Sequence, residues 1–290
     1  MNFAGILEEH LGFERAFAVA RDLHNSYVPF LSDADVRYLV NSVMRIDGNM
    51  IFEEYYNHVG AHKIVSDVIM ALYPSEKTIK YYMAREHLDT DDEITAFEVK
   101  VEKSRLDLGV INGHSYGYEI KTELDNLGKL KKQIHDYSKA FEYVSAVIHP
   151  SHLDGVRKIV PEHCGIKIYR LSRNGCSFRT IRKSIRSPYL DVETQIANMT
   201  SRELEYVLKA RGHSNIPSVR AHREDLIRDS IPKVRMNSLF KRTLKNRFRA
   251  RWEHVKRNFD RINPVDVQAF FNSMSDPKWV YYRNSSMVYR

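Results

Sequence analysis

The stretch that decides the fold is RLDLGVINGHSYGYEIKTELDNLGKLKKQIHDY, residues 105–137. It contains two short apolar runs, Leu106–Ile111 and Tyr116–Ile120, separated by Asn112-Gly113. An Asn-Gly pair tolerates the positive φ angles of a tight turn, so between two β-prone runs it predicts a hairpin. We therefore expect two antiparallel strands in this stretch, joined at the Asn-Gly pair.

Polar side chains would meet across this hairpin. Side chains alternate between the two faces of a strand, so Glu119 and Lys121 share one face and Ile120 points to the other. The hairpin would bring Asp107 close to that pair. Magnesium prefers oxygen ligands and usually takes one or two protein carboxylates. Asp107 and Glu119 are thus candidate ligands for Mg²⁺ or Mn²⁺, with the carbonyl of Ile120 as a further ligand. Lys121 would hold the attacking water or a phosphate as a compact cation.

A second pair of polar residues follows on an expected helix. Gln133 and Tyr137 are four residues apart, so they lie on the same helix face. The combined pattern of Asp107, the Glu119–Lys121 pair and this QxxxY resembles the PD-(D/E)XK nuclease superfamily, in its RecB-like branch. The fuller string RxD…GYEIK…D…L..Q…Y also resembles a poorly characterised family of bacterial and phage proteins within that superfamily. The resemblance covers about residues 94–150, and the proline of the superfamily name is absent before Asp107.

The resemblance implies an α/β fold with a restriction-endonuclease-like core, in which helices flank a mixed sheet. Strands are expected at about 94–103, 106–112, 116–121 and 143–149. It also implies an enzyme, a Mg²⁺- or Mn²⁺-dependent hydrolase that cleaves DNA phosphodiester bonds in phage or bacterial DNA processing, repair or defence. Gln133 and Tyr137 would face the metal site and the DNA.

The hydrophobic periodicity divides the chain into three regions. Residues 1–88 are expected to be helical, with helices at about 3–24, 32–44, 52–73 and 75–88. The nuclease core would span 89–186, including a helix at 126–141 and short strands near 165–170 and 176–182. Residues 187–290 are expected to be helical again and basic.

Further acidic and basic residues could complete the catalytic site. Members of the superfamily often add an acidic residue before the first Asp, and Glu98 is favoured here over its rival Glu86. Arg105 could meet a phosphate or form a structural ion pair. Asp125 matches an acidic position of the resembling family, but an N-cap for the helix at 126–141 explains it equally well.

The basic C-terminal region contains a stretch that resembles a SAP-type DNA-binding motif, a helix, an extended loop and a second helix over residues 204–229. Arg211, Arg220 and Arg223 would face phosphates, although an ordinary helical hairpin is the competing interpretation. Residues 235–257 carry nine Lys/Arg against one acidic residue, Glu253. An apolar stripe in this segment would pack onto the protein. Its basic flank would contact nucleic acid through Lys241, Lys245 and Arg249.

The composition is consistent with a polyanionic partner without identifying one. The chain has 290 residues, a net charge of +8 and an apolar content of 43%. The N-terminal sequence has no secretory signal and no apolar run is long enough to span a membrane, which predicts a cytoplasmic protein of a bacterium or phage-infected host. DNA is the expected partner, with no membrane partner; a partner protein or a second copy of the chain remains open. The alternatives to a nuclease are a catalytically inactive nucleic-acid-binding protein that reuses the fold and, less favoured, a protein-interaction scaffold.

Overall fold

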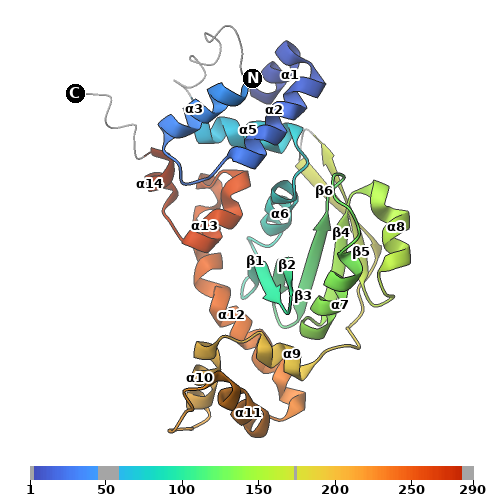
Figure 1. Cartoon of the computed structure of the whole chain (residues 1–290), viewed down its shortest axis with the longest axis vertical. Helices are drawn as coiled ribbons and strands as arrows, with labels where there is room; N and C mark the ends of the chain where they lie inside the picture. The colour runs from blue at the N-terminus through green and yellow to red at the C-terminus, as the bar shows by residue number, and fades with distance from the viewer. Residues whose placement is uncertain (1–2, 45–58, 173–174, 283–290) are drawn as a thin grey trace, which may run out of the picture. The chain divides into compact units, whose positions relative to one another are not determined.

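The computed structural model describes residues 3–44, 59–172 and 175–282 of the chain (Figure 1). The chain forms two compact units. The first combines residues 1–88, 171–175 and 253–290, and the second combines 89–170 and 176–252. The expected C-terminal region, 187–290, is therefore divided between the two units, and the division falls within one long helix.

The second unit contains a six-stranded mixed sheet in the order β1-β2-β3-β4-β5-β6. Strands β1, β2 and β3 pair antiparallel, whereas β3, β4 and β5 pair parallel. The expected mixed α/β architecture is therefore confirmed. The strands are β1 (Ile94–Val101), β2 (Ser104–Ile111), β3 (Ser115–Lys121), β4 (Tyr143–Ile148), β5 (Gly165–Ser172) and β6 (Gly175–Arg182).

Helices cover this sheet and extend the unit beyond it. Helix α7 packs against β1 to β4 (Figure 1). Its buried face includes Ile134 and Tyr137, and neither residue is exposed to solvent. The helices of this part are α7 (Leu130–Ala140), α8 (Leu153–Ile159), α9 (Val192–Ala197), α10 (Ser201–Ala210), α11 (Arg220–Ser230) and α12 (Lys233–Asn258), with a 3₁₀ turn η1 (Pro150–His152).

Helices α10 and α12 follow from local sequence rules. A capping box starts α10, because Thr200 and Glu203 each bond the other's backbone N–H. Along α12 the predicted apolar stripe is confirmed as core, because its four large side chains are all buried. They are Phe240, Leu244, Phe248 and Trp252.

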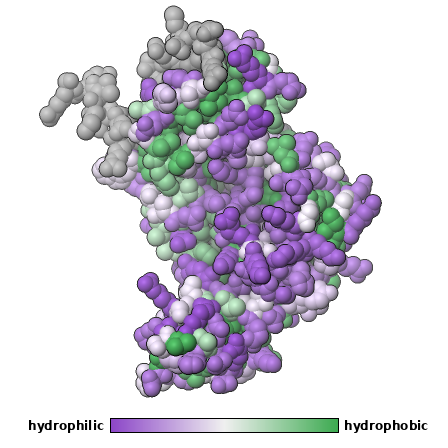
Figure 2. All heavy atoms as spheres, in the orientation of Figure 1, coloured by the Kyte–Doolittle hydropathy of each residue, from purple (hydrophilic) through white to green (hydrophobic). Residues whose placement is uncertain are grey.

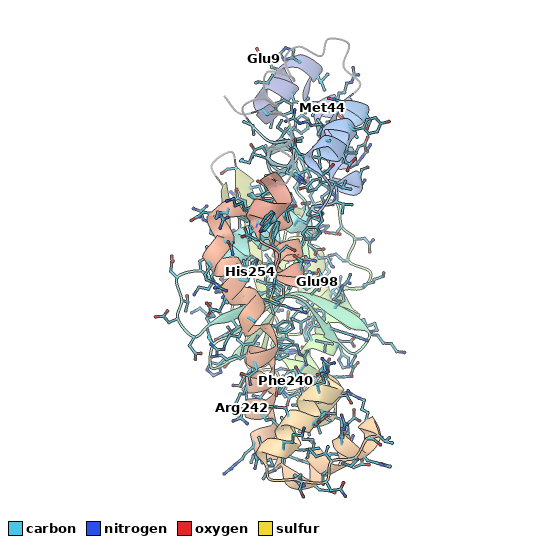
Figure 3. The ribbon with its side chains drawn as sticks, turned by 90° about the vertical axis from the view of Figure 1, so that its left-hand side faces the viewer. Glu9, Met44, Glu98, Phe240, Arg242 and His254 are labelled. Carbon is cyan, nitrogen blue, oxygen red and sulfur yellow. The ribbon has the colours of Figure 1, made fainter. Side chains whose placement is uncertain are left out.

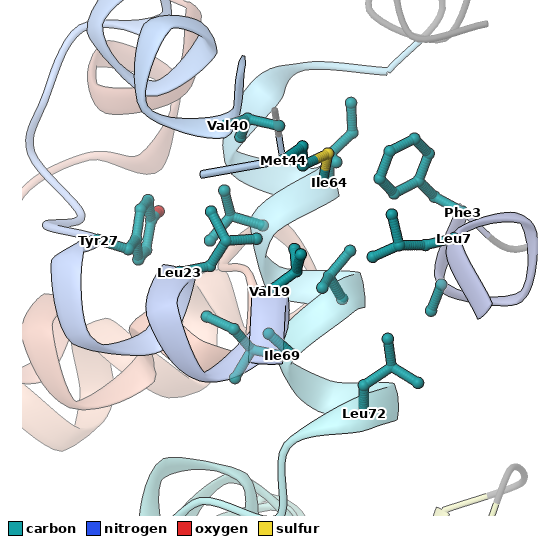
Figure 4. Close-up of a cluster of buried hydrophobic side chains, with 14 of the residues drawn as sticks. Phe3, Leu7, Val19, Leu23, Tyr27, Val40, Met44, Ile64, Ile69 and Leu72 are labelled. Atoms are coloured by element: carbon teal, nitrogen blue, oxygen red, sulfur yellow. The ribbon is translucent and has the colours of Figure 1, made fainter. Parts of the chain in front are cut away.

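The first unit is helical and has its own hydrophobic core (Figure 4). Leu7, Leu23, Val40 and Ile64 are among its buried side chains. The elements are α1 (Phe3–Leu11), α2 (Phe13–Ser26), α3 (Asp33–Met44), α5 (Ala61–Leu72), α6 (Glu76–Arg85), η2 (Phe259–Arg261), η3 (Pro264–Asp266), α13 (Val267–Ser273) and α14 (Pro277–Tyr282).

Three predicted helices have different bounds. The helix expected at 3–24 is split, because Gly12 adopts a φ of 74°, which an α-helix cannot contain. The helix expected at 126–141 begins only at Leu130. The helix expected at 52–73 starts at Ala61, and its first positions, 52–58, lie outside the described residues.

No helix in the described ranges is both long enough and apolar enough to cross a membrane.

Candidate active site

The predicted hairpin is present and positions the candidate site. Strands β2 and β3 pair from Ile111↔Ser115 to Leu108↔Tyr118. The turn closes with a hydrogen bond from Asn112 N–H to the His114 carbonyl at 3.0 Å, and Gly113 takes a φ of 132°. Glycine is suited to this position because it has no Cβ to clash at positive φ.

Asp107 lies where β2 separates from β3. The β2–β3 ladder ends at the pair Leu108↔Tyr118, so the Ile120 N–H lies beyond it. The Asp107 carboxylate accepts the Ile120 N–H instead, at 2.7 Å. This bond fixes the Asp107 side chain beside the Glu119–Lys121 segment, as the sequence predicted.

Glu119 is buried and is held by two side chains. Only 1% of it is exposed. One carboxylate oxygen accepts from Lys121 Nζ at 2.6 Å, and the other accepts from the Tyr137 hydroxyl at 2.9 Å. An unpaired charge at this depth would be strongly unfavourable, so the lysine is what allows an ionised carboxylate here.

The lysine responds to the same environment. Burial by itself would lower the pKa of Lys121, but the charge and hydrogen bond of Glu119, followed by the charges of Asp107 and Asp125, raise it. Lys121 is therefore a cation in the neutral pH range, and both candidate carboxylates act on it electrostatically.

Helix α7 contributes Tyr137 and Gln133 to this site. The Tyr137 hydroxyl lies 2.9 Å from both the Arg105 carbonyl and Glu119, so its single proton has two acceptors. Burial, and then the charge of Glu119, raises the pKa of Tyr137, which keeps it a neutral phenol. One turn earlier, the Gln133 Oε1 atom is buried without a hydrogen-bond partner among the residues that the structure describes. A buried amide oxygen in this state is available to a group that the protein alone does not supply.

Glu98 lies opposite Asp107 on the neighbouring strand. The register pairs Phe97 with Leu108 and Val99 with Leu106, which brackets Glu98 and Asp107 between them. Carboxylate oxygens of Glu98 and Asp107 lie within 4.8 Å of one another. Glu98 also has a φ of 56°, a left-handed conformation that costs a non-glycine residue about 1–3 kcal/mol. Strained residues of this kind cluster at functional sites.

This geometry favours Glu98 over Glu86 as the additional acidic residue of the site. Glu86 is the exposed C-cap of α6, whereas Glu98 is on the strand that pairs with the Asp107 strand. Arg105 forms an ion pair with Glu98. Of the two alternatives for Arg105, the structural ion pair is present, and a contact with phosphate stays a prediction.

The donor set fits a hard divalent cation. Mg²⁺ binds oxygen at about 2.0–2.1 Å, so two carboxylate oxygens within 4.8 Å can share an ion after small side-chain rotations. Glu119 already accepts two hydrogen bonds, but each carboxylate oxygen has two lone pairs and can accept again. The Ile120 backbone is tied to Asp107 and so lies at the same place.

The predicted N-cap role of Asp125 is wrong. Lys129 occupies the N-cap of α7. Asp125 instead accepts the N–H and the hydroxyl of Thr122, both at 2.7 Å, and so closes the turn that follows β3. A local Asx-type bond of this kind satisfies the chain where it leaves the strand.

All three cations predicted to contact DNA from α12 have carboxylate partners inside the second unit. Lys241 is 2.9 Å from Glu142, a carboxylate whose side chain is 5% exposed. Burial by itself would raise the pKa of Glu142, but the hydrogen bond from Lys241 holds it low. Lys245 bonds Asp92 at 2.7 Å, and Arg249 lies 3.5 Å from the same carboxylate.

The helix–loop–helix predicted at 204–229 forms as α10 and α11, and its arginines differ in their surroundings. Arg223 donates to the Pro217 carbonyl at 2.6 Å and to the Ser201 carbonyl at 3.0 Å, so it holds the loop against α10. Arg220 pairs with Glu224 at 2.8 Å. Arg211 is exposed at the end of α10.

Sequence reasoning missed a group of exposed residues between α10 and α12: Arg202, Tyr206, Arg235 and Arg242. In a segment with nine basic residues, the sequence pattern does not distinguish an arginine that is paired from one that faces solvent. Hydrophilic residues cover most of the face in Figure 2, so hydropathy gives no contrast either.

Comparison with known proteins identifies a family. A relative described as "Protein cII" of Enterobacteria phage P4 is 27% identical over 108 residues, which is 37% of this chain and 41% of that protein. The match therefore spans less than half of the relative's length. No solved structure matches the chain. The family model "Bacteriophage P4 protein cII" matches residues 75–270, well over half of the chain and including the whole of the hairpin and α7. The chain therefore belongs to the bacteriophage P4 protein cII family.

Proposed function

We propose that this protein is a metal-dependent deoxyribonuclease of the PD-(D/E)XK type, which hydrolyses DNA phosphodiester bonds. The observation that carries the proposal is the buried centre in which Lys121 and Tyr137 both bond Glu119 while Asp107 is fixed beside them. A Glu-x-Lys pair that belonged only to a solvated strand face would be exposed and would not bond a residue of α7.

The mixed sheet supports the finer fold assignment. The hairpin β2–β3 continues into parallel strands β4 and β5, and α7 covers the strands that carry the acidic residues. This arrangement agrees with the core implied by the sequence resemblance, a mixed sheet flanked by helices.

Asp107 and Glu98 are the residues that would hold Mg²⁺ or Mn²⁺, joined by Glu119 and the Ile120 carbonyl. A bound divalent ion supplies an acidified water and offsets the charge of the phosphate as it is attacked. The residues of the chain do the remaining work. Lys121 holds the attacking water or the phosphate oxygen, and electrostatic preorganisation of this kind contributes most where water is excluded.

Tyr137 and Gln133 have supporting roles in this proposal. Tyr137 orients Glu119 through its hydroxyl, so it is a positioning residue. The unpartnered oxygen of Gln133 would accept a hydrogen bond from the metal-bound water or from a nucleotide.

A catalytically inactive DNA-binding protein is the second candidate, and one observation favours it. Both oxygens of Glu119 are already engaged within the protein, and the side chain is 1% exposed. Such a centre could have a purely structural role, as buried ion pairs have in other proteins.

The full-length protein should be incubated with linear, circular and single-stranded DNA in Mg²⁺, in Mn²⁺ and in EDTA. We expect metal-dependent cleavage that Asp107→Asn and Glu119→Gln abolish. Asp136→Asn is a matched control, because Asp136 is likewise buried, at 3% exposure, and is bonded by a lysine, Lys132, but is not a candidate site residue.

Salt-sensitive DNA binding without cleavage under all conditions would support the inactive candidate instead. Equal losses of cleavage in Asp136→Asn and Glu119→Gln would assign the effect to folding rather than to the site.

A further inference from the structure

A basic groove runs between α10 and α12 in the second unit. Two adjoining hollows of about 540 and 420 Å³ share Tyr206, Thr243 and Asn246 in their linings. Six arginines also line them: Arg202, Arg211, Arg235, Arg242, Arg247 and Arg249.

One carboxylate lies among these lining residues, and it is already neutralised. Arg247 donates two hydrogen bonds to Glu203, at 2.7 and 2.6 Å. Burial would raise the pKa of Glu203, but Arg247 and the Thr200 backbone bond hold it low. Arg249 also lies 3.5 Å from Asp92, so Arg247 and Arg249 both have a carboxylate partner within the protein.

The remaining arginines are exposed. Within the described ranges, no carboxylate lies at ion-pair distance from Arg202, Arg211, Arg235 or Arg242. This contrasts with Lys241 and Lys245 on the same helix, which bond Glu142 and Asp92. A set of unpaired arginines around a hollow is a site for an anion of matching shape.

The spacing along α12 defines the shape of that anion. Arg235, Arg242 and Arg249 are seven residues apart, so they recur on one face every two turns, about 10 Å apart along the axis. Figure 3 labels Arg242 and, two residues earlier, Phe240, which is buried on another side of the helix. The row is about 20 Å long in total, which suits a chain of phosphates rather than one small anion.

Tyr206 adds a flat apolar surface at the centre of this row. Its side chain is 65% exposed on α10, although it lines both hollows. An exposed aromatic ring among arginines is the arrangement on which unpaired bases stack.

We propose that this groove binds single-stranded nucleic acid, with the arginine row on the phosphodiester backbone and Tyr206 stacked on a base. The site is separate from the Glu119 centre and does not depend on the nuclease proposal. Of the three basic residues that the sequence indicated on α12, Arg249 lines this groove, whereas Lys241 and Lys245 do not.

The test is fluorescence anisotropy of the full chain with a labelled single-stranded oligonucleotide in EDTA, over a range of salt concentrations. The double variant R235Q/R242Q should bind at least tenfold more weakly. Its salt slope should fall by about 1.4, the amount for two phosphate contacts on single strands. The variant R157Q/K158Q on α8 loses the same charge from exposed positions and should bind like wild type.

Tyr206→Ala separates stacking from charge. It should weaken binding roughly tenfold while leaving the salt slope unchanged, because stacking releases no counterions. Circular dichroism and thermal melting check that each variant is folded.

Equal weakening in R157Q/K158Q and R235Q/R242Q would overturn the assignment to this groove. Binding of a duplex with the same affinity, unaffected by Tyr206→Ala, would overturn the single-strand assignment. Competition by poly-glutamate at the affinity of the oligonucleotide would make the partner an acidic protein instead.

Discussion

Two buried carboxylates, one in each unit, both accept hydrogen bonds from tyrosine, but only one of them accepts a hydrogen bond from a lysine. Glu119 in the second unit accepts from one tyrosine and one lysine. Asp266 in the first unit accepts from two tyrosines, Tyr281 at 2.7 Å and Tyr27 at 3.0 Å. Both side chains are essentially inaccessible, with exposures of 1% and 0%.

The two carboxylates differ in whether a cation contacts them. Lys121 bonds Glu119 directly, and its own pKa rises in response. For Asp266, burial is the dominant influence and raises the pKa to about 6, because hydrogen bonds from the tyrosines and the charge of Lys77 only partly offset it. An ammonium in contact favours the charged form of a buried carboxylate, whereas the tyrosine hydroxyls around Asp266 do not prevent its pKa from rising to about 6.

The largest effects are expected when the lysine is removed. Lys121→Met should lower single-turnover cleavage by on the order of a hundredfold or more, the range for loss of one preorganised charge donor. It should also destabilise the protein by about 3–5 kcal/mol at pH 7.5, because Glu119 is left buried and unpaired. Urea denaturation at pH 7.5 and pH 5 measures the loss of stability, which should be smaller at pH 5.

The double variant Glu119→Gln/Lys121→Met is the control for folding. It should recover most of the stability and none of the activity. Recovery of cleavage in this variant would remove both residues from the proposed mechanism.

A pH dependence is expected from Asp266. Its folded pKa of about 6 is above its ordinary 3.8, so folding takes up a proton between these values. The contribution is fully present below about pH 4 and is lost as the pH rises to about 6, with a total of about 3 kcal/mol.

Asp266→Asn should flatten this part of the stability curve, measured by denaturation of wild type and variant from pH 4 to pH 7. If both proteins showed the same slope, Asp266 would not be the group that titrates.

Smaller effects on stability are expected when Tyr281, which bonds Asp266, and Tyr137, which bonds Glu119, are replaced. Tyr281→Phe should cost about 1–3 kcal/mol at pH 7.5, where its acceptor Asp266 is charged, and less at pH 5. Tyr137→Phe should cost a similar amount that does not change between these pH values, because the Lys121 ammonium that bonds Glu119 stays charged at both. Thermal melts of both variants at the two pH values test the contrast, and a pH-independent Tyr281→Phe would contradict it.

The smallest effect extends the comparison to a carboxylate at the surface. Asp92 has two cations, Lys245 and Arg249, but its side chain is 73% exposed. Water screens such pairs, so Lys245→Gln should leave the melting temperature unchanged within error. A measurable drop would mean that Lys245 also contributes through its packing on the protein.

The sequence alone determined the local parts of the site. The hairpin and its turn follow from alternating apolar residues around Asn112-Gly113, and the pairing of Gln133 with Tyr137 on one face follows from the helical repeat. The burial of the apolar stripe on α12 follows from the same repeat. These features depend on residues within a few positions of one another, which is why pattern and propensity were sufficient.

Only the tertiary structure decided which charges are available. The position of Glu98 beside Asp107 depends on strand register and on a left-handed residue that no pattern indicates. Lys241 meets Glu142 across 99 positions, and Tyr27 meets Asp266 across 239. A basic sequence pattern reads the same for a paired and an unpaired cation, because the partner that neutralises it is brought in by the fold and not by the neighbouring sequence.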